Sequence, residues 1–388
     1  MTTARLLISD SEKNANMYYA TRFLAPDPFI FVQFDPSTDA RDSALSGLRG
    51  QGVMVMSDLE VDRARIQAKV KEILSYSKLA VQAKKSLGKD PTMMDVVGEF
   101  LKSRSVKQVD VPMDFGLAYA DALRARGFTV DPKPDPFFPE RMIKSEEEIA
   151  MLTESLRTTE VALDRAIELI RNSEVKSDGT LWIGGKPLTV ELLRKSMHLL
   201  MMEGECVAQH TIIAPGVQAV DPHNEGSGPL RANEPIVMDV FPQHARTRYF
   251  ADITRTVVKG KASDKIRKMF DAVKEGQEIA YRMIKEGVNG KAVHDAILKY
   301  FESLGFHTGE QGGRMQGFFH GTGHGVGLEI HEPPRVSGKS DILKAGMVVT
   351  VEPGLYYLDA GGIRIEDMIV VTKDGCKLLT QAPKILEV

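Results

Sequence analysis

Five residues able to bind metal ions stand in apolar or glycine-rich stretches in the second half of the chain. They are Asp239 in IVMDV, Asp252 in FADIT, His324 in GTGHGVG, Glu352 in TVEPG and Glu366 in GIRIEDMIVV. A carboxylate in such a stretch loses hydration on folding, so it has to be paired, protonated or bound to a cation. The fold must therefore bring a compensating charge to each position, and one pair of divalent metal ions would serve them all.

The kinds of side chain narrow the choice of metal. Four carboxylates and one imidazole form a hard, mixed oxygen and nitrogen set that suits Mn, Co, Fe or Zn. The alternative is that these are ordinary strand residues on solvated faces or in structural ion pairs, because charged side chains are mostly exposed. That alternative accounts for any one of them, but it accounts poorly for all five together with the histidines nearby.

Residue spacing along the expected strands supports a shared site, because alternate side chains of a strand project to the same face. Three pairs should therefore project together: Asp252 with Thr254, Thr350 with Glu352, and Arg364 with Glu366. The residues between them are apolar and should face the core: Ile253, Val351, Ile363 and Ile365.

Three histidines, His320, His324 and His331, occur in the stretch HGTGHGVGLEIHEPP. Its many glycines make a regular helix improbable, so this is not the helical HExxH zinc motif. Glycines instead let the backbone approach an ion or a substrate, while imidazoles supply a metal ligand and proton carriers near neutral pH. A single histidine here would more simply be structural, but three so close together favour a functional site.

These motifs resemble those of the pita-bread metallopeptidases, which include Xaa-Pro dipeptidase (prolidase), aminopeptidase P and methionine aminopeptidase. The resemblance spans about residues 145–385. It implies that Asp239 chelates one metal ion, that Asp252 and Glu366 bridge two, and that His324 and Glu352 complete the site. The expected cofactor is two divalent metal ions, with Mn preferred and Co, Zn or Fe as alternatives.

The resemblance also implies the chemistry, which is hydrolysis by a water molecule that two metal ions activate. Glu352 would accept the proton of the water, and His331 with His223 in DPHNEGSGPL would stabilise the oxyanion or hold the substrate carbonyl. Arg364 would position Glu366 or a substrate carboxylate. His320 would contact the pocket on the proline side.

The stretch MDVFPQHARTRYFADITRT departs from the family pattern. Phe241 stands where the family has glycine, and the interval between the two aspartates is longer. We expect a longer hairpin connection over 241–251 with the metal site intact. An exposed loop is the simpler interpretation of its polar residues, and contact with substrate is the alternative for His244, Arg246, Arg248 and Tyr249. Asn233 also replaces a glycine, but asparagine tolerates a positive φ.

Four prolines between Pro132 and Pro139 disfavour both helix and central strand, and they predict a boundary between domains. We expect an α+β protein with a smaller α/β domain of the creatinase/prolidase type over 1–135 and a pita-bread catalytic domain over 140–388. In the first, patterning predicts strands at 6–10, 29–34 and 52–58 and helices at 61–77 and 90–103. In the second, Ser145 and Glu148 resemble a capping box that opens a helix, and further helices are expected at 190–203, 264–286 and 291–304.

Composition fits an intracellular enzyme, with a formal net charge of −3 that gives no sign of a nucleic-acid surface. The two cysteines form no metal motif, the N-terminus lacks a secretion signal, and no apolar run is long enough for a membrane span. We therefore expect a cytoplasmic protein.

The N-terminal domain favours the Xaa-Pro enzymes within the family and implies a homodimer. The expected function is a metal-dependent exopeptidase, a Xaa-Pro dipeptidase or aminopeptidase, acting on small peptides with proline in second position. Two alternatives stay open: a creatinase-like hydrolase or lyase of a non-peptide small molecule, and a non-catalytic binding protein.

Overall fold

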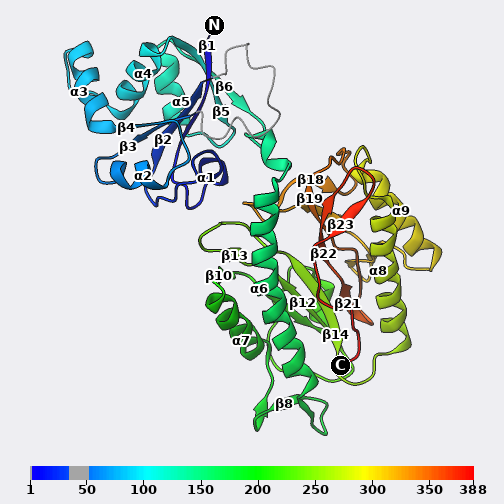
Figure 1. Cartoon of the computed structure of the whole chain (residues 1–388). Helices are drawn as coiled ribbons and strands as arrows, with labels where there is room; N and C mark the ends of the chain where they lie inside the picture. The colour runs from blue at the N-terminus through cyan, green and yellow to red at the C-terminus, as the bar shows by residue number, and fades with distance from the viewer. Residues whose placement is uncertain (1, 35–51) are drawn as a thin grey trace. The chain divides into compact units, whose positions relative to one another are not determined.

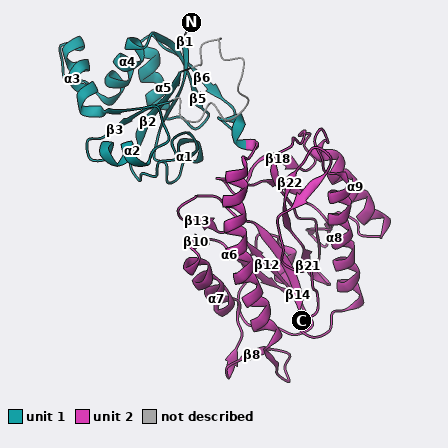
Figure 2. Cartoon of the chain, viewed as in Figure 1, with its two compact units in different colours: residues 1–141 teal, residues 142–388 magenta. Residues whose placement is uncertain are grey.

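The computed structural model describes residues 2–34 and 52–388, and the chain divides into two compact units, Met1–Arg141 and Met142–Val388 (Figure 2). The division falls just after the proline cluster that predicted a boundary. Among the described residues, no helix is both long and apolar enough to cross a membrane.

The first unit contains a six-stranded mixed sheet in the order β4-β3-β2-β1-β5-β6. Its strands are β1 (Thr2–Ser9), β2 (Phe29–Phe34), β3 (Val53–Met56), β4 (Glu72–Ser75), β5 (Val106–Pro112) and β6 (Thr129–Lys133). The central strand β1 pairs antiparallel with β2 and parallel with β5. Pro132 lies in β6, and the edge position of this strand tolerates a residue that cannot donate a backbone hydrogen bond.

The helices of this unit are α1 (Ala15–Thr21), α2 (Val61–Gln67), α3 (Tyr76–Leu87), α4 (Met93–Ser103) and α5 (Leu117–Ala125). The single helix predicted over 61–77 is wrong. Residues 72–75 instead form β4, which pairs parallel with β3, and Ser75 then caps α3 by accepting a hydrogen bond from the Lys78 N–H at 3.3 Å. Sheet pairing and this cap override the helical periodicity.

The second unit is built from four helices and several small antiparallel sheets (Figure 1). The helices are α6 (Glu146–Arg171), α7 (Val190–Glu203), α8 (Asp264–Met283) and α9 (Gly290–Ser303). The capping box of Ser145 and Glu148 that opens α6 is confirmed. The other three helices also match their predictions to within three residues, and α8 ends early because Ile284 is extended.

Three groups of strands carry the site. They are the sheet β11-β12-β14, the sheet β18-β17-β19-β22-β23 and the hairpin β20-β21. Their bounds are β11 (Ile212–Pro215), β12 (Pro235–Val240), β14 (Ile253–Val258), β17 (Gly323–Gly325), β18 (Glu332–Val336), β19 (Val348–Val351), β20 (Gly354–Tyr357), β21 (Gly361–Arg364), β22 (Asp367–Val371) and β23 (Cys376–Leu378). Shorter strands border them: β7 (Glu174–Val175), β8 (Leu181–Ile183), β9 (Lys186–Pro187), β10 (Cys206–Val207), β13 (Gln243–His244), β15 (Gly309–Gln311) and β16 (Arg314–Gln316).

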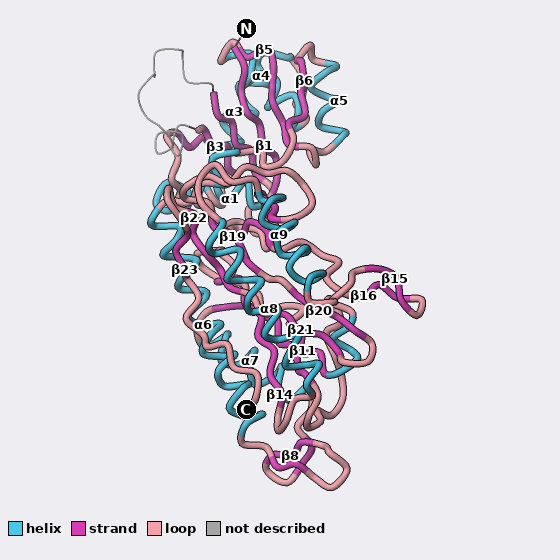
Figure 3. The backbone as a smooth tube through the Cα atoms, turned by 90° about the vertical axis from the view of Figure 1, so that its right-hand side faces the viewer, coloured by secondary structure: helices cyan, strands magenta, loops and turns pink. Residues whose placement is uncertain are grey.

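Helices cover these strands on two sides. Helix α6 contacts β12 and β14, while α8 contacts β20 and β21 and lies across them in Figure 3. The core beneath α8 and α9 includes Val351, Ile363 and Ile365, which confirms that these residues face inward. Strands β12 and β14 pair as the expected antiparallel hairpin, with Asp239 opposite Thr254, and Asn233 adopts the expected positive φ of 65°.

Candidate metal centre

A cavity of about 680 Å³ in the second unit gathers every site residue predicted from the sequence. The five predicted ligands Asp239, Asp252, His324, Glu352 and Glu366 line it, together with His223, His320, His331 and Arg364. The five predicted ligands come from β12, from the residue just before β14, from β17, and from the turns that follow β19 and β21. Residues far apart in the chain thus share one site because the ends of several strands meet there.

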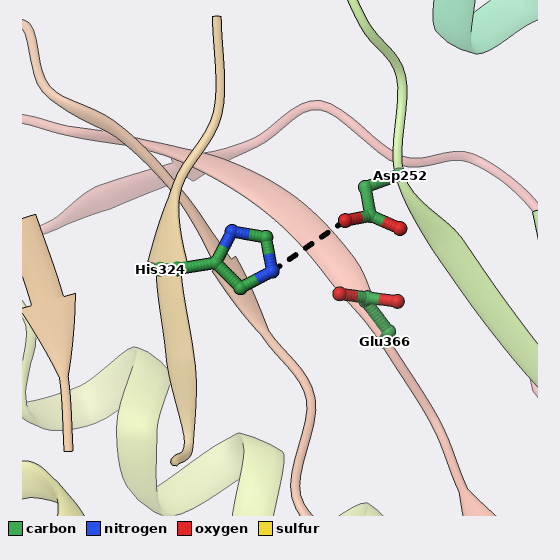
Figure 4. A group of neighbouring side chains, drawn as sticks. All are labelled: Asp252, His324 and Glu366. Carbon is green, nitrogen blue, oxygen red and sulfur yellow. Dashed lines mark ion pairs between the residues drawn. The ribbon is translucent and has the colours of Figure 1, made fainter. Parts of the chain in front are cut away.

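Asp252, His324 and Glu366 form the tightest group (Figure 4). One ligand atom of each lies within 4.8 Å of the others, and His324 Nε2 is 3.6 Å from Asp252 Oδ2. All three residues are buried. Glu352 joins this group through its Oε1, which is 3.5 Å from the same His324 Nε2, and its backbone N–H donates to the Thr322 carbonyl at 2.7 Å.

The hydrogen bonding of His324 fixes which ring nitrogen faces the carboxylates. Its Nδ1 is 3.1 Å from the Gly325 carbonyl, so the proton belongs on Nδ1 and the Nε2 lone pair points toward Asp252 and Glu352. Burial, followed by the neighbouring His331, lowers the pKa of His324 to about 3, which keeps the ring neutral. A lone pair facing carboxylate oxygens is unfavourable unless a cation lies between them.

Asp239 lies beside this group, and one of its carboxylate oxygens also lacks a partner. Its Oδ2 accepts a hydrogen bond from Arg364 Nη2 at 2.8 Å, whereas its buried Oδ1 has no hydrogen-bond partner among the residues described. Buried polar atoms in native proteins nearly always have a partner, so an orphaned carboxylate oxygen suggests an ion.

Three carboxyl groups of the cavity, those of Asp252, Glu352 and Glu366, have raised pKa values. Burial, then Glu366, holds the pKa of Asp252 well above its usual range, and burial followed by Glu352 does the same for Glu366. Burial raises the pKa of Glu352 to about 8, although Arg364 opposes this rise. Four acidic groups and a neutral imidazole therefore share a site that contains too little positive charge. This donor set, with its orphaned oxygen and free Nε2, fits divalent metal ions.

Thr254 and Arg364 hold the acidic groups in place. The Thr254 hydroxyl donates to Glu366 Oε2 at 2.8 Å, and Arg364 Nε donates to the Thr254 Oγ1 at 3.3 Å. Arg364 thus bonds directly to Asp239 and reaches Glu366 only through Thr254. The shared face of Asp252 and Thr254 follows the predicted strand parity.

His320 differs from the other histidines because protein groups engage both of its ring nitrogens. Nδ1 donates to the Gly321 carbonyl at 2.8 Å, and Nε2 accepts from the Tyr356 hydroxyl at 2.9 Å. The Tyr356 oxygen in turn accepts from Arg364 Nη1 at 2.9 Å. Burial lowers the pKa of His320 to about 3. The ring is therefore a neutral, fixed part of the cavity wall.

His331 and His223 reach solvent on the cavity wall. The His331 ring packs edge-on against His324, with 4.4 Å between centroids. Desolvation, then Arg335 and His223, lowers the pKa of His331. Among the described residues, neither ring makes a hydrogen bond within the protein, so both can bind a substrate.

Sequence reasoning missed part of the cavity lining. The cavity is also lined by three polar residues, Arg335, Ser337 and Lys339, and by three apolar residues, Ile212, Phe319 and Ile330. Arg335 is close enough to lower the pKa of His331 and Glu352. The sequence feature that could have indicated Arg335 as a cavity residue is its place four residues after His331. In the structure it lies on the partly exposed face of β18.

The connection 241–251 is exposed at Arg246, as the sequence suggested, but it is not exposed at His244 and Tyr249. His244 and Tyr249 are each 1% exposed and pack against α6, where the Tyr249 hydroxyl donates to Glu148 Oε1 at 2.5 Å and His244 Nε2 lies 3.5 Å from Glu154. Neither residue lines the cavity. Phe241 does, so this residue is the part of the connection that can meet a substrate.

The chain is similar to known proteins over much of its length. Residues 150–373 match metallopeptidase family M24. A Xaa-Pro dipeptidase of Pyrococcus horikoshii is 34% identical over 247 residues, which cover 63% of this chain and 64% of that protein. The match thus spans less than two thirds of this relative.

Two solved structures resemble the whole chain. The prolidase of Pyrococcus horikoshii has a TM-score of 0.75 at 25% identity, covering 99% of this chain and 95% of its own. An X-Pro aminopeptidase from Thermotoga maritima has a TM-score of 0.78 at 22% identity, covering 100% of this chain and 98% of its own. The predicted α+β, pita-bread architecture is therefore confirmed.

Proposed function

The chain belongs to metallopeptidase family M24, and on this premise we propose that it is a metal-dependent exopeptidase that hydrolyses the bond between a residue and a following proline. One observation carries the proposal. Four carboxylates and the free Nε2 of His324 line a single cavity, and the protein supplies too few cations there to balance them.

We assign the metal ligands as Asp239, Asp252, His324, Glu352 and Glu366. The orphaned Asp239 Oδ1 and the unprotonated His324 Nε2 support this set. We expect two divalent ions, with Mn preferred and Co, Zn or Fe as alternatives, because the oxygen-rich set is permissive. Bound there, such ions supply Lewis acidity that polarises a carbonyl group and lowers the pKa of water.

The protein's own groups would move the protons and hold the substrate. Glu352 lines the cavity beside His324, so its carboxylate, once a bound metal ion keeps it ionised, would take a proton during attack on the peptide carbonyl. His331 and His223 have uncommitted ring nitrogens, and their N–H groups would donate to the carbonyl oxygen as negative charge develops on it. His320 would hold the cavity wall in place, and Arg364 would hold the Asp239 carboxylate.

Two cations support a dipeptide as the substrate. Arg335 and Lys339 line the cavity, and their side chains form no ion pair with another described residue. The free carboxylate of a dipeptide lies one residue beyond the scissile bond, whereas a longer peptide has an uncharged amide there. A guanidinium binds such a carboxylate strongly. We therefore favour a Xaa-Pro dipeptidase over an aminopeptidase.

Three wider expectations belong to the same proposal. The first unit would be the creatinase/prolidase-type domain, and likeness of fold to prolidase over nearly the whole chain supports this. A homodimer and a cytoplasmic location stay predictions from the sequence. No feature of the described residues favours the creatinase-like or the non-catalytic alternative.

The test is hydrolysis of Xaa-Pro dipeptides, Xaa-Pro-Xaa tripeptides and matched dipeptides without proline. Chelator-stripped protein reloaded with Mn, Co or Zn should cleave only the proline dipeptides, and Glu366→Gln treated identically is the control. Arg335→Met should raise the KM for the proline dipeptides, because it removes the guanidinium that would bind their free carboxylate. Cleavage of tripeptides alone would indicate an aminopeptidase, and metal binding without any peptide cleavage would contradict the proposed substrate class.

A further inference from the structure

Arg255 in β14 is a fully buried arginine whose guanidinium donates to five oxygen atoms. The acceptors are the carbonyls of Thr254 at 2.9 Å, Glu366 at 2.7 Å, Ala382 at 2.6 Å and Pro383 at 3.0 Å, and Asp367 Oδ1 at 2.7 Å. A buried guanidinium is costly unless its donors are satisfied. Here they are satisfied largely by backbone, so the side chain ties separate segments together.

Two of the five acceptors belong to the backbone that carries the candidate ligands. Thr254 and Glu366 are joined twice, because the Thr254 hydroxyl donates to the Glu366 carboxylate and the Glu366 N–H donates to the Thr254 carbonyl at 3.0 Å. Arg255 binds the carbonyls of both residues. It therefore fixes the Thr254–Glu366 contact from the side opposite the cavity, because neighbouring residues of a strand face opposite ways.

Two further acceptors connect Arg255 to residues beyond the span that matches the family, which ends at 373. Ala382 and Pro383 hold the guanidinium through their carbonyls. Lys384 then pairs with Asp367 Oδ2 at 2.8 Å, and the Tyr281 hydroxyl donates to the same oxygen at 2.6 Å. The guanidinium of Arg255 is thus held in one orientation by Asp367 and by residues 382–384.

A second buried side chain acts on the same backbone. Gln277 of α8 donates through Nε2 to the carbonyls of Val351 at 2.8 Å and Ile365 at 3.0 Å. These residues directly precede Glu352 and Glu366. The turns that present the two glutamates are therefore both held from behind, by Gln277 and by Arg255.

We propose that Arg255 is a positioning residue for Glu366 and that residues 382–384 complete the metal centre by holding Arg255 in place. The inference rests on the proposed assignment of Glu366 as a metal ligand. Groups that orient metal ligands typically change metal affinity by about 10–100-fold when they are replaced. Lysine cannot reproduce the five-donor fork, so Arg255→Lys keeps the charge and removes the geometry.

The experiment measures Co²⁺ binding to the chelator-stripped full chain by calorimetry and by the absorption spectrum of bound Co²⁺. Arg255→Lys should raise the Kd by about 10–100-fold and change the spectrum. Arg267→Lys is the matched control, because Arg267 is a partly exposed arginine that pairs with Asp264 and Glu387, away from the ligands. It should leave both readouts unchanged.

General destabilisation has to be separated from positioning. Phe301→Leu reduces the packing of α9 against Gly276 of α8 and against Phe318, and Phe301 itself binds neither Arg255 nor a proposed ligand, so it provides a variant of lowered Tm whose Co²⁺ binding should stay normal. Two shortened proteins, one ending at Gln381 and one at Lys384, differ only in residues 382–384 and therefore test that segment alone. Both lack Leu386 and Glu387, and only the one ending at Gln381 should bind Co²⁺ about tenfold more weakly.

Wild-type Kd and spectrum in Arg255→Lys would overturn the proposal, as would equal weakening by Phe301→Leu. If Arg255→Lys fails to fold, equal Co²⁺ binding by the two shortened chains would overturn it. These outcomes are distinct from failure of the proposed function, which is Co²⁺ binding by the wild type without cleavage of any Xaa-Pro peptide.

Discussion

Glu366 and Asp367 are neighbours in the chain and both are buried, but their carboxylates have opposite surroundings. Glu366 belongs to a carboxylate cluster with Asp239, Asp252 and Glu352, where burial and like charges raise its pKa. Asp367 is paired with Arg255 and Lys384, which outweigh its burial and lower its pKa. The protein thus pairs one carboxylate with two cations, whereas the other, which we propose as a metal ligand, has no ion pair among the described residues.

This contrast separates function from structure without reference to any relative. A buried carboxylate with built-in cations is a structural element, because its charge is balanced when the chain folds. A buried group of four carboxylates in which one arginine pairs with a single member keeps an excess of negative charge, and such unbalanced charge is typical of functional sites. The predictions below test whether the two environments respond as oppositely as their charges imply.

The largest effect is expected from Asp252→Asn or Glu366→Gln. Each should abolish metal binding and reduce turnover by at least about 10³-fold, because each removes a carboxylate that we propose as a metal ligand. In the metal-free protein each should also raise the free energy of unfolding by about 1–2 kcal/mol, since a repulsive buried charge is removed. Metal analysis, peptide kinetics and urea unfolding measure these effects, and normal turnover in either variant would refute the ligand assignment.

Asp367→Asn should do the reverse and destabilise the protein by about 3 kcal/mol, because Arg255 and Lys384 lose their anionic partner. A carboxyl group with a lowered pKa stabilises the fold above its unfolded pKa of 3.8, and this stability is lost only as the pH falls through the lower folded value. The difference from wild type should therefore be constant between about pH 5 and 8. Urea unfolding followed by the fluorescence of Trp182, the single tryptophan, measures it in the second unit. If the gap in unfolding free energy between wild type and Asp367→Asn already shrinks between about pH 8 and 6, the Asp367 carboxyl group has a raised pKa, as the cavity carboxyl groups do, and the contrast is wrong.

His331→Ala should retain the metal and lose turnover by about a hundredfold, because His331 lies in the cavity but outside the ligand set. His307→Ala, which lies outside this cavity, is the control. Wild-type kinetics in His331→Ala would remove this residue from the mechanism.

The smallest effect is expected at Phe241, an uncharged neighbour of the carboxylate cluster. Phe241→Ala should enlarge the cavity and change KM severalfold among substrates with different residues before proline, while metal content stays normal. Arg246→Ala, in the same connection but exposed and paired with Glu205, should change neither. Loss of metal from Phe241→Ala would show that the connection supports the ligands.

The sequence predicted those parts of the site that depend on residues close together in the chain. Apolar context marked the five candidate ligands, and strand parity placed Thr254 and Asp252 on one face. The capping box of Ser145 and Glu148 located the start of α6 because its hydrogen bonds span three residues.

Long-range contacts could not be predicted in this way. The helix expected over 61–77 failed because residues 72–75 pair with β3, and His244 was taken for a loop residue because its burial depends on α6. Arg255 and Asp367 are 112 residues apart, so neither periodicity nor spacing could show that one balances the other. The roles of the cavity residues themselves stay predictions that chemistry has to test.

The most direct test of the metal centre is anomalous diffraction at the Mn absorption edge from crystals of chelator-stripped protein reloaded with Mn²⁺. We predict strong anomalous peaks bounded by Asp239, Asp252, His324, Glu352 and Glu366, with the Asp239 Oδ1 and the His324 Nε2 as ligands. An empty cluster, or peaks only at exposed acidic residues such as Asp264, would contradict the account.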